Sequence, residues 1–394
     1  MDNGLDIKLK TGKFKNLFMR VMNTFLEPDH LYILMDWFAS GVSFLTMFAL
    51  YRVSPNIEAL GNGSWLLNAF TTSLFVSAAA QYYSMFRKTK AMETVIAFMP
   101  ILILEGIILF FIMDFKYFII IYPAVFLNAF FASFRGSLFG QGRMVFGAFL
   151  NMIEQVLRFS FFLALVYMSF SLEISILLNN LLAYVITTGM VFIFFHKELK
   201  IKEISIKFDK TIIIYSIVFV VINLIMSGDM LLLKNTSWMG SFALIKPWGQ
   251  IIIVVSTPFI NIILKKYLHK EPMGFVLILF ATTMGIYALI NIGFGDKISE
   301  LVFGYSIESR LHIASVIIEH LFISIGIIMV YKMLLDERIN VTFIISFMVT
   351  VIVFVLNIRV FMWVSPFVIY PCGLAAMLLV NRKLLLRDEY GSKK

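Results

Sequence analysis

Apolar runs of similar length alternate with short polar segments along most of the chain. Each run is close to the roughly 20 residues that an α-helix needs to cross the hydrocarbon core of a bilayer. The pattern predicts an all-α polytopic membrane protein with about twelve transmembrane helices. They lie at residues 31–51, 62–85, 91–113, 116–137, 143–168, 172–195, 212–234, 238–264, 273–294, 310–334, 341–362 and 364–381.

The longest polar stretch, at residues 196–211, follows the sixth run and predicts a cytoplasmic linker. It divides the chain into two six-helix lobes, at 31–195 and 212–381, followed by a cytoplasmic tail at 382–394. Before the first run, within residues 1–30, apolar side chains recur at helical spacing with basic residues between them. This pattern is typical of an interfacial helix that lies on the inner membrane surface.

Composition and charge agree with this assignment. Hydrophobic residues make up 60% of the chain and charged residues only 14%, which excludes an ordinary soluble domain. When both termini are placed in the cytoplasm, the cytoplasmic segments carry most of the 33 Lys and Arg residues, as the positive-inside rule requires. The net charge of +9 therefore reflects basic loops, and we expect no nucleic-acid partner.

The sequence contains no motif typical of an enzyme. The five His residues are scattered, and the single Cys excludes an intrachain disulfide. HExxH, GxSxG, CxxC and glycine-rich phosphate loops are all missing from the sequence. We therefore expect neither catalysis nor a bound cofactor or metal.

Charged residues inside the apolar runs need a cavity or a partner, because a charge in the bilayer is costly. Glu154 and Arg158 are four residues apart on one predicted helix and can neutralise each other. Asp229 and Lys246 lie at matched depth on either side of a predicted turn at Lys234–Trp238. They can neutralise each other or hold a charged ligand. The remaining intramembrane charges are Asp36, Glu105, Glu319 and Arg359.

Several segments resemble polysaccharide (O-antigen) flippases of the multidrug/oligosaccharidyl-lipid/polysaccharide (MOP) exporter superfamily. Phe134–Met168 (FRGSLFGQGRMVFGAFLNMIEQVLRFSFFLALVYM) is similar to their helix 4–5 junction, and Ala49–Phe70 to their first outer loop. Ser227–Asn235 (SGDMLLLKN) resembles their seventh helix, and Glu300–Ser309 the stretch before their tenth. The chain departs from the family in its short length and clipped outer loops.

The resemblance implies a V-shaped pair of six-helix lobes around a cationic central cavity, lined mainly by the first, second, seventh and eighth helices. It also implies alternating-access transport of a polyprenyl-diphosphate-linked oligosaccharide, a repeat unit of O-antigen, capsule or exopolysaccharide, from the inner to the outer leaflet. Since the diphosphate is anionic, the candidate substrate-binding residues are Lys246, Arg158, Arg359 and Lys234. The candidate ion-coupling residues, for H⁺ or Na⁺, are Asp229, Asp36, Glu105 and Glu319.

These expectations place the protein in the cell inner (plasma) membrane, in contact with membrane lipids and the lipid-linked glycan. A polysaccharide polymerase and the chain-length machinery are further expected partners. Two other functions stay open: a polysaccharide polymerase, which would carry a long outer loop with catalytic Arg residues, and a multidrug exporter, which would favour an acid-rich pocket for organic cations. An assembly role without transport is the remaining alternative.

The predicted topology can be tested by labelling single cysteines from outside the cell. We expect Cys at positions 62, 235 and 297 to be labelled, because they fall in or beside outer loops. Cys at positions 202 and 266 should stay unlabelled, because both lie in basic cytoplasmic segments. Labelling of position 202 from outside would overturn the topology.

Overall fold

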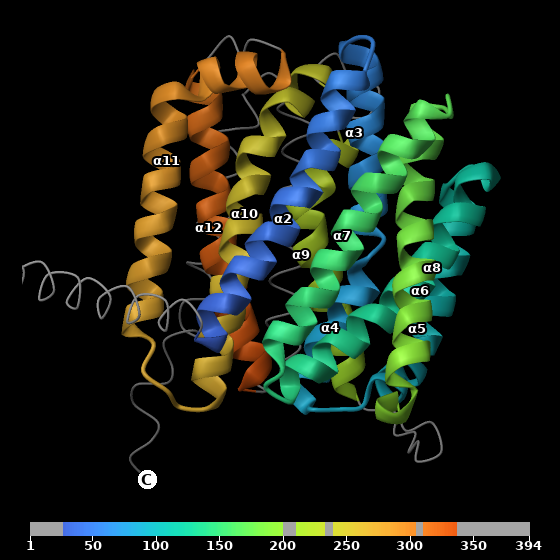
Figure 1. Ribbon diagram of the computed structural model, residues 1–394, viewed down its shortest axis with the longest axis vertical. Helices are drawn as coiled ribbons and strands as arrows, with labels where there is room; N and C mark the ends of the chain where they lie inside the picture. Colours follow the sequence, from blue (N-terminus) through green and yellow to red (C-terminus); the bar gives the residue numbers. More distant parts are fainter. Residues whose placement is uncertain (1–26, 200–209, 233–238, 305–309, 337–394) are drawn as a thin grey trace, which may run out of the picture.

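A computed structural model describes residues 27–199, 210–232, 239–304 and 310–336. Within these ranges the regular secondary structure is α-helical (Figure 1). The helices are α2 (Pro28–Val53), α3 (Ile57–Thr72), α4 (Phe75–Arg87), α5 (Ala91–Ile112), α6 (Phe115–Gly140), α7 (Met144–Tyr167), α8 (Leu172–Leu199), α9 (Lys210–Leu232), α10 (Met239–Leu268), α11 (Gly274–Phe303) and α12 (Arg310–Leu335).

The helices confirm the predicted all-α membrane fold. Seven of the described helices are long and apolar enough to cross a membrane: α2, α5, α6, α7, α8, α10 and α11. Large apolar side chains stay exposed on their outward faces; Phe111 near the end of α5 is 80% exposed. Such a surface suits lipid contact. The interfacial helix, the linker core and the runs at 341–362 and 364–381 lie outside the described residues.

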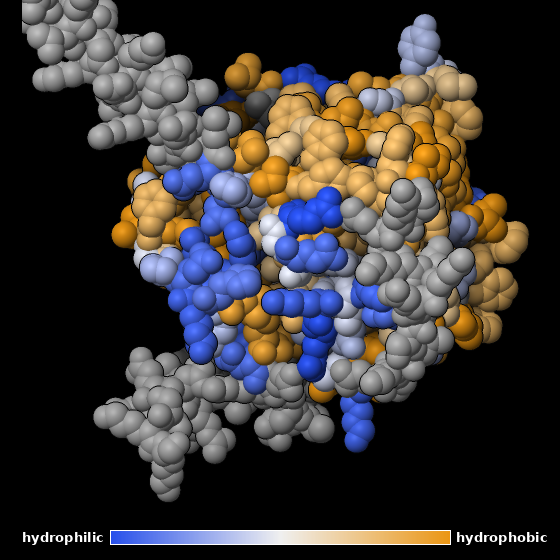
Figure 2. Space-filling view, turned by 60° about the horizontal axis from the view of Figure 1, so that its bottom comes forward, coloured by the Kyte–Doolittle hydropathy of each residue, from blue (hydrophilic) through white to orange (hydrophobic). Residues whose placement is uncertain are grey.

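The ends of the bundle differ from its sides in polarity. Figure 2 brings forward the end at which α4 meets α5 and α10 meets α11, and hydrophilic residues gather on this face between apolar flanks. Basic residues belong to these helix ends, including Arg87 at the end of α4 and Lys265 and Lys266 at the end of α10. A basic face bordered by apolar sides agrees with the predicted cytoplasmic side.

One predicted helix is divided in two. The run at 62–85 was expected to form a single span, but α3 ends at Thr72 and α4 begins at Phe75. Thr71, Thr72 and Ser73 donate their hydroxyls to the carbonyls of Leu67 (2.9 Å), Asn68 (2.8 Å) and Phe70 (2.6 Å). Ser and Thr that bond back to the preceding turn bend helices. A cluster of three consecutive hydroxyl residues therefore explains a break that apolarity alone did not predict.

Two neighbouring groups of helices make up the bundle. In the first group α2 packs on α7, and α4 packs on α6; in the second, α10 packs on α12. The groups meet where α3 and α4 contact α9 and where α10 contacts α2 and α3. The division into lobes at the linker remains a prediction, because the core of the linker lies outside the described residues.

Helices α4 and α6 approach closely at Gly136. A Cβ atom added to Gly136 would lie 2.1 Å from the backbone carbonyl oxygen of Gln81, closer than side chains can approach. Backbone atoms of packed helices cannot move aside without shifting the helices. Gly136 therefore fixes the distance between α4 and α6.

We expect Gly136→Ala to lower the free energy of unfolding by about 1–3 kcal/mol, because it overpacks this contact. Gly189→Ala on α8 is the matched control, since a Cβ added there meets nothing within 4 Å. Thermal unfolding of the solubilised protein measures both effects. Equal unfolding temperatures for the two variants would contradict the close approach.

Candidate functional site

A central cavity of about 310 Å³ lies between the two groups of helices. Residues of α2, α3, α7 and α8 line it from one group, and residues of α9, α10 and α12 from the other. Arg158 and His320 are its ionisable lining residues, and no Asp or Glu of the described part of the chain lines it. The amides in the wall are Asn68, Gln155, Asn179, Asn180 and Gln250. Much of the wall is apolar, but its polar part combines a guanidinium with amides and contains no acid among the described residues. That polar part suits an anionic group and sugar hydroxyls.

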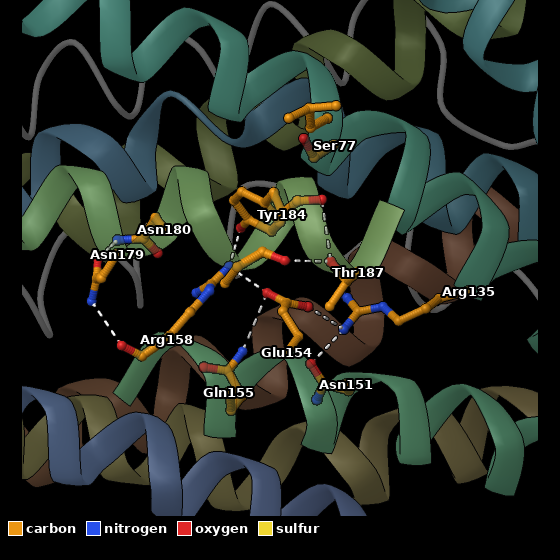
Figure 3. Close-up of polar contacts among 12 residues, drawn as sticks. Ser77, Arg135, Asn151, Glu154, Gln155, Arg158, Asn179, Asn180, Tyr184 and Thr187 are labelled. Carbon is orange, nitrogen blue, oxygen red and sulfur yellow. Dashed lines mark hydrogen bonds and ion pairs between the residues drawn. The ribbon is translucent and has the colours of Figure 1, made fainter. Parts of the chain in front are cut away.

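A chain of polar contacts, here called the Arg135 network, lies beside this cavity. It contains Asp36, Gln81, Arg135, Asn151, Glu154, Arg158 and Tyr184, which come from α2, α4, α6, α7 and α8. Figure 3 shows its part around Arg135, Glu154 and Arg158. Arg135 is its centre. Its guanidinium donates to the side chains of Asn151 and Gln81, the latter at 2.6 Å, and lies 3.6 Å from the Glu154 carboxylate.

The remaining contacts extend the network at both ends. At one end, Asn151 donates its amide to the Asp36 carboxylate at 2.9 Å. At the other end, Arg158 pairs with Glu154 and donates to the Tyr184 hydroxyl, whose ring it also faces. Two carboxylates and two guanidiniums therefore share one network, and their formal charges cancel.

The structure confirms the contact between Glu154 and Arg158 that their spacing predicted. The predicted helix at 116–137 contains Arg135, but this residue was not among the expected intramembrane charges. Arg135 lies within α6, and its side chain is only 16% exposed. Helix α6 thus carries an additional guanidinium into the protein interior.

Lys246 lies in α10 and is 2% exposed. Its ammonium lies 5.9 Å from the centre of the Phe242 ring, and it does not line the central cavity. Gln250, one turn further along α10, does line it. Asp229 belongs to α9, but its side chain lies outside the described residues, so the predicted contact between Asp229 and Lys246 remains a prediction.

Two other predicted site residues, Glu105 and Asp36, lie apart from the central cavity. Glu105 on α5 is buried beside a separate cavity, and Asp36 belongs to the Arg135 network. Glu319 lies on α12, but its side chain is outside the described residues. Lys234 and Arg359 also lie outside them.

The sequence did not indicate the cavity amides or the contacts between the two groups of helices. Gln250 on α10 donates to Asn68 on α3 at 3.3 Å, and Asn179 on α8 donates to the Arg158 carbonyl at 3.3 Å. Single Asn and Gln residues within apolar runs were the signal available for them. An amide placed inside the bilayer needs a partner or a polar ligand, as a charge does.

Contacts between α2 and α10 lie on both sides of the central cavity along these helices. Near the start of α2, Asp29 pairs with Lys265 at 2.7 Å and Lys266 at 3.4 Å. Near its end, the Tyr51 hydroxyl donates to the carbonyl of Ala243. The cavity residues of both helices fall between these two sets of contacts.

The sequence matches no protein-family model and no curated protein. Solved structures do resemble the fold. A MOP superfamily transporter from Pyrococcus furiosus aligns with a TM-score of 0.59 and 13% identity, over 91% of this chain and 96% of that one. An outward-facing multidrug resistance MATE family transporter of the same superfamily aligns with a TM-score of 0.62 and 11% identity, over the same shares.

An inward-facing structure of a MATE family transporter aligns with a lower TM-score of 0.50, at 13% identity, over 91% of this chain and 95% of that one. The chain therefore has the fold of MOP superfamily transporters.

Because Glu154 contacts both Arg135 and Arg158, we expect its removal to destabilise the protein more than the removal of Arg158. Glu154→Gln leaves two buried guanidiniums without it, and we expect a loss of about 3–5 kcal/mol of stability. Arg158→Gln should cost less, because Arg135 still neutralises Glu154. Thermal unfolding measures the difference, with Arg143→Gln at the exposed start of α7 as the control. An equal or larger loss for Arg158→Gln would refute the sharing.

Proposed function

We propose that this protein is a flippase that moves a polyprenyl-diphosphate-linked oligosaccharide from the inner to the outer leaflet by alternating access. The lining of the central cavity is the observation that carries this proposal. Arg158 supplies a positive charge, and five amides line the same cavity. No acid of the described residues belongs to this lining. Guanidinium groups bind phosphate oxygens through charge-assisted hydrogen bonds, and amides bind sugar hydroxyls through both donors and acceptors.

One hydrogen-bond donor of Arg158 is not used in its contacts with the described residues. Its terminal nitrogen contacts Glu154 and Tyr184, but its Nε has no hydrogen-bond partner among the described residues. Gln155 beside it also has a side-chain oxygen without one. Buried polar groups without a partner are costly. A phosphate and a sugar hydroxyl in the cavity would satisfy these two groups once the buried side chains turn toward it.

The contacts between α2 and α10 fit alternating access to this cavity. Opening toward the predicted inner side requires the Asp29 ion pairs to separate, and opening toward the outer side requires the Tyr51 contact to break. A cargo that favours one open state shifts the population toward that state. The lipid tail would stay in the bilayer while the head group crosses through the cavity.

A multidrug exporter of the same superfamily is the second candidate function. Two of the solved structures with a similar fold are multidrug resistance transporters of the MATE family. An organic cation would, however, need an acidic group at its binding site, and the described lining of the central cavity contains a guanidinium instead. We therefore favour the anionic cargo, with a polymerase and the chain-length machinery as partners that would use the exported glycan.

Reconstituted vesicles provide the direct test. Purified protein should speed the appearance of a polyprenyl-diphosphate-linked glycan in the opposite leaflet, read by a lectin or glycosidase that acts only outside. Deletion of the gene should leave the same lipid-linked glycan on the inner leaflet of the cell membrane. Transport of lipophilic cations without transport of the glycan would favour the multidrug exporter.

Substitutions at Lys246 test whether it meets the cargo. Lys246→Arg should keep partial export, Lys246→Ala should lose most of it, and Lys246→Glu should be inactive because it repels the diphosphate. Export is compared with the amount of membrane-inserted protein, and Lys297→Ala at an exposed position serves as the control. Full export by a normally inserted Lys246→Ala would refute the contact. Restored export in Asp229→Asn/Lys246→Gln would assign the two residues to scaffolding.

A further inference from the structure

A second cavity, here called the Glu105 cavity, lies between α3, α5, the start of α6 and α9. Its volume is about 550 Å³, which leaves room for several water molecules. Most of the wall is apolar. The polar lining comes from Glu105 and Asp114, the hydroxyls of Thr72, Ser73 and Tyr117, and the indole of Trp65.

Glu105 differs from the other described intramembrane acids in having no partner. Its side chain is 4% exposed, and neither carboxylate oxygen has a hydrogen-bond partner among the described residues. Asp36 and Glu154, by contrast, each accept contacts within the Arg135 network. An unpaired buried carboxylate is far more costly than the neutral acid. Burial therefore favours the protonated carboxyl group at Glu105 whenever the cavity is dry.

The Glu105 cavity extends from this carboxyl group to one end of the bundle. Ile108 and Ile112 on α5 line it toward Asp114 and Tyr117, which mark the turn into α6. Nine residues separate Glu105 from Asp114, so the path is roughly 13 Å long at 1.5 Å per residue. The predicted topology places Asp114 at the outer surface, where it is exposed. Water entering beside Asp114 can therefore carry protons toward Glu105.

The cavity wall suits a proton better than a metal ion. Thr72 and Ser73 already donate their hydroxyls to backbone carbonyls, and Asp114 lies at the far end. Hard cations take several oxygen ligands at once, whereas a proton needs only the carboxyl group. The titratable groups at the mouth of the path are Asp114, Lys116, Tyr117 and Glu173, whose carboxylate accepts the Tyr117 hydroxyl. Further in, Tyr122 packs against Gly106. Helix α9 contributes the apolar side chains of Val220 and Leu224.

We infer that Glu105 binds a proton delivered from the outer surface through this cavity, and that this proton drives the movement of α9 against α3 and α5. The inference rests on the proposed transport function and names its driving ion. A charged Glu105 needs water and thus an open cavity, whereas a neutral Glu105 lets the apolar residues of α9 close over it. Proton binding therefore favours one arrangement of the two groups of helices over the other.

Labelling with dicyclohexylcarbodiimide tests the site without any cargo. This apolar reagent reacts with protonated carboxyl groups in apolar surroundings. In vesicles of the full-length protein, mass spectrometry should find Glu105 modified at acidic outer pH and protected as the outer pH rises. Asp36 and Glu154 should stay unmodified at both pH values, because both are bonded within the Arg135 network. The inference would be overturned if Glu105 were not labelled, or if its labelling did not change with the outer pH.

Variants connect the site to transport. Glu105→Gln should abolish the acceleration of export by an acidic exterior while glycan exchange without a gradient continues. The matched control is Glu93→Gln, which removes an acid from the first turn of the same helix, outside the cavity. A gradient response retained by Glu105→Gln would refute the coupling. Proton-dependent labelling in a protein that moves no glycan would support the site and refute only the proposed cargo.

Discussion

Everything polar inside this bundle is constrained by the cost of placing charge in a low-dielectric interior. The Arg135 network meets that constraint by joining five helices around two carboxylates and two guanidiniums. Its contacts hold α2, α4, α6, α7 and α8 at fixed distances, and the close approach at Gly136 leaves α4 and α6 little freedom. These contacts tie the helices of the first group together, as the proposed alternating access would require of a group that moves as a unit.

The two cavities differ in the charge of their lining residues, and there is a physical reason to keep acids and the guanidinium in separate cavities. The central cavity carries Arg158 without a lining acid, whereas the Glu105 cavity carries two acids without a lining base among its described residues. An acid placed in the central cavity would repel an anionic cargo whenever it lost its proton. Because α9 contributes to both walls, the two sites can still influence each other through the same helix.

Local patterns in the sequence predicted what depends on local spacing. Apolar run lengths gave the helices up to residue 335, and the four-residue spacing gave the contact between Glu154 and Arg158. Contacts between distant helices were beyond such patterns. The contacts of Arg135 depend on how α4 and α7 pack against α6, and the bond between Gln250 and Asn68 depends on how the two groups pack. The break before α4 was readable in principle from its three consecutive hydroxyl residues.

The sequence presented Arg158 as either a structural partner or a substrate ligand, and the shared carboxylate makes the two roles compatible. If Glu154 had only one partner, a phosphate that drew Arg158 away would leave a bare carboxylate in the protein interior, at a cost of several kcal/mol. Because Arg135 also lies 3.6 Å from Glu154, its positive charge remains beside that carboxylate when Arg158 turns toward the cavity. The second guanidinium thus lowers the cost of using Arg158 as a ligand. Binding of the cargo would in this way replace the contact of Arg158 with Glu154 by a contact of Arg158 with the cargo.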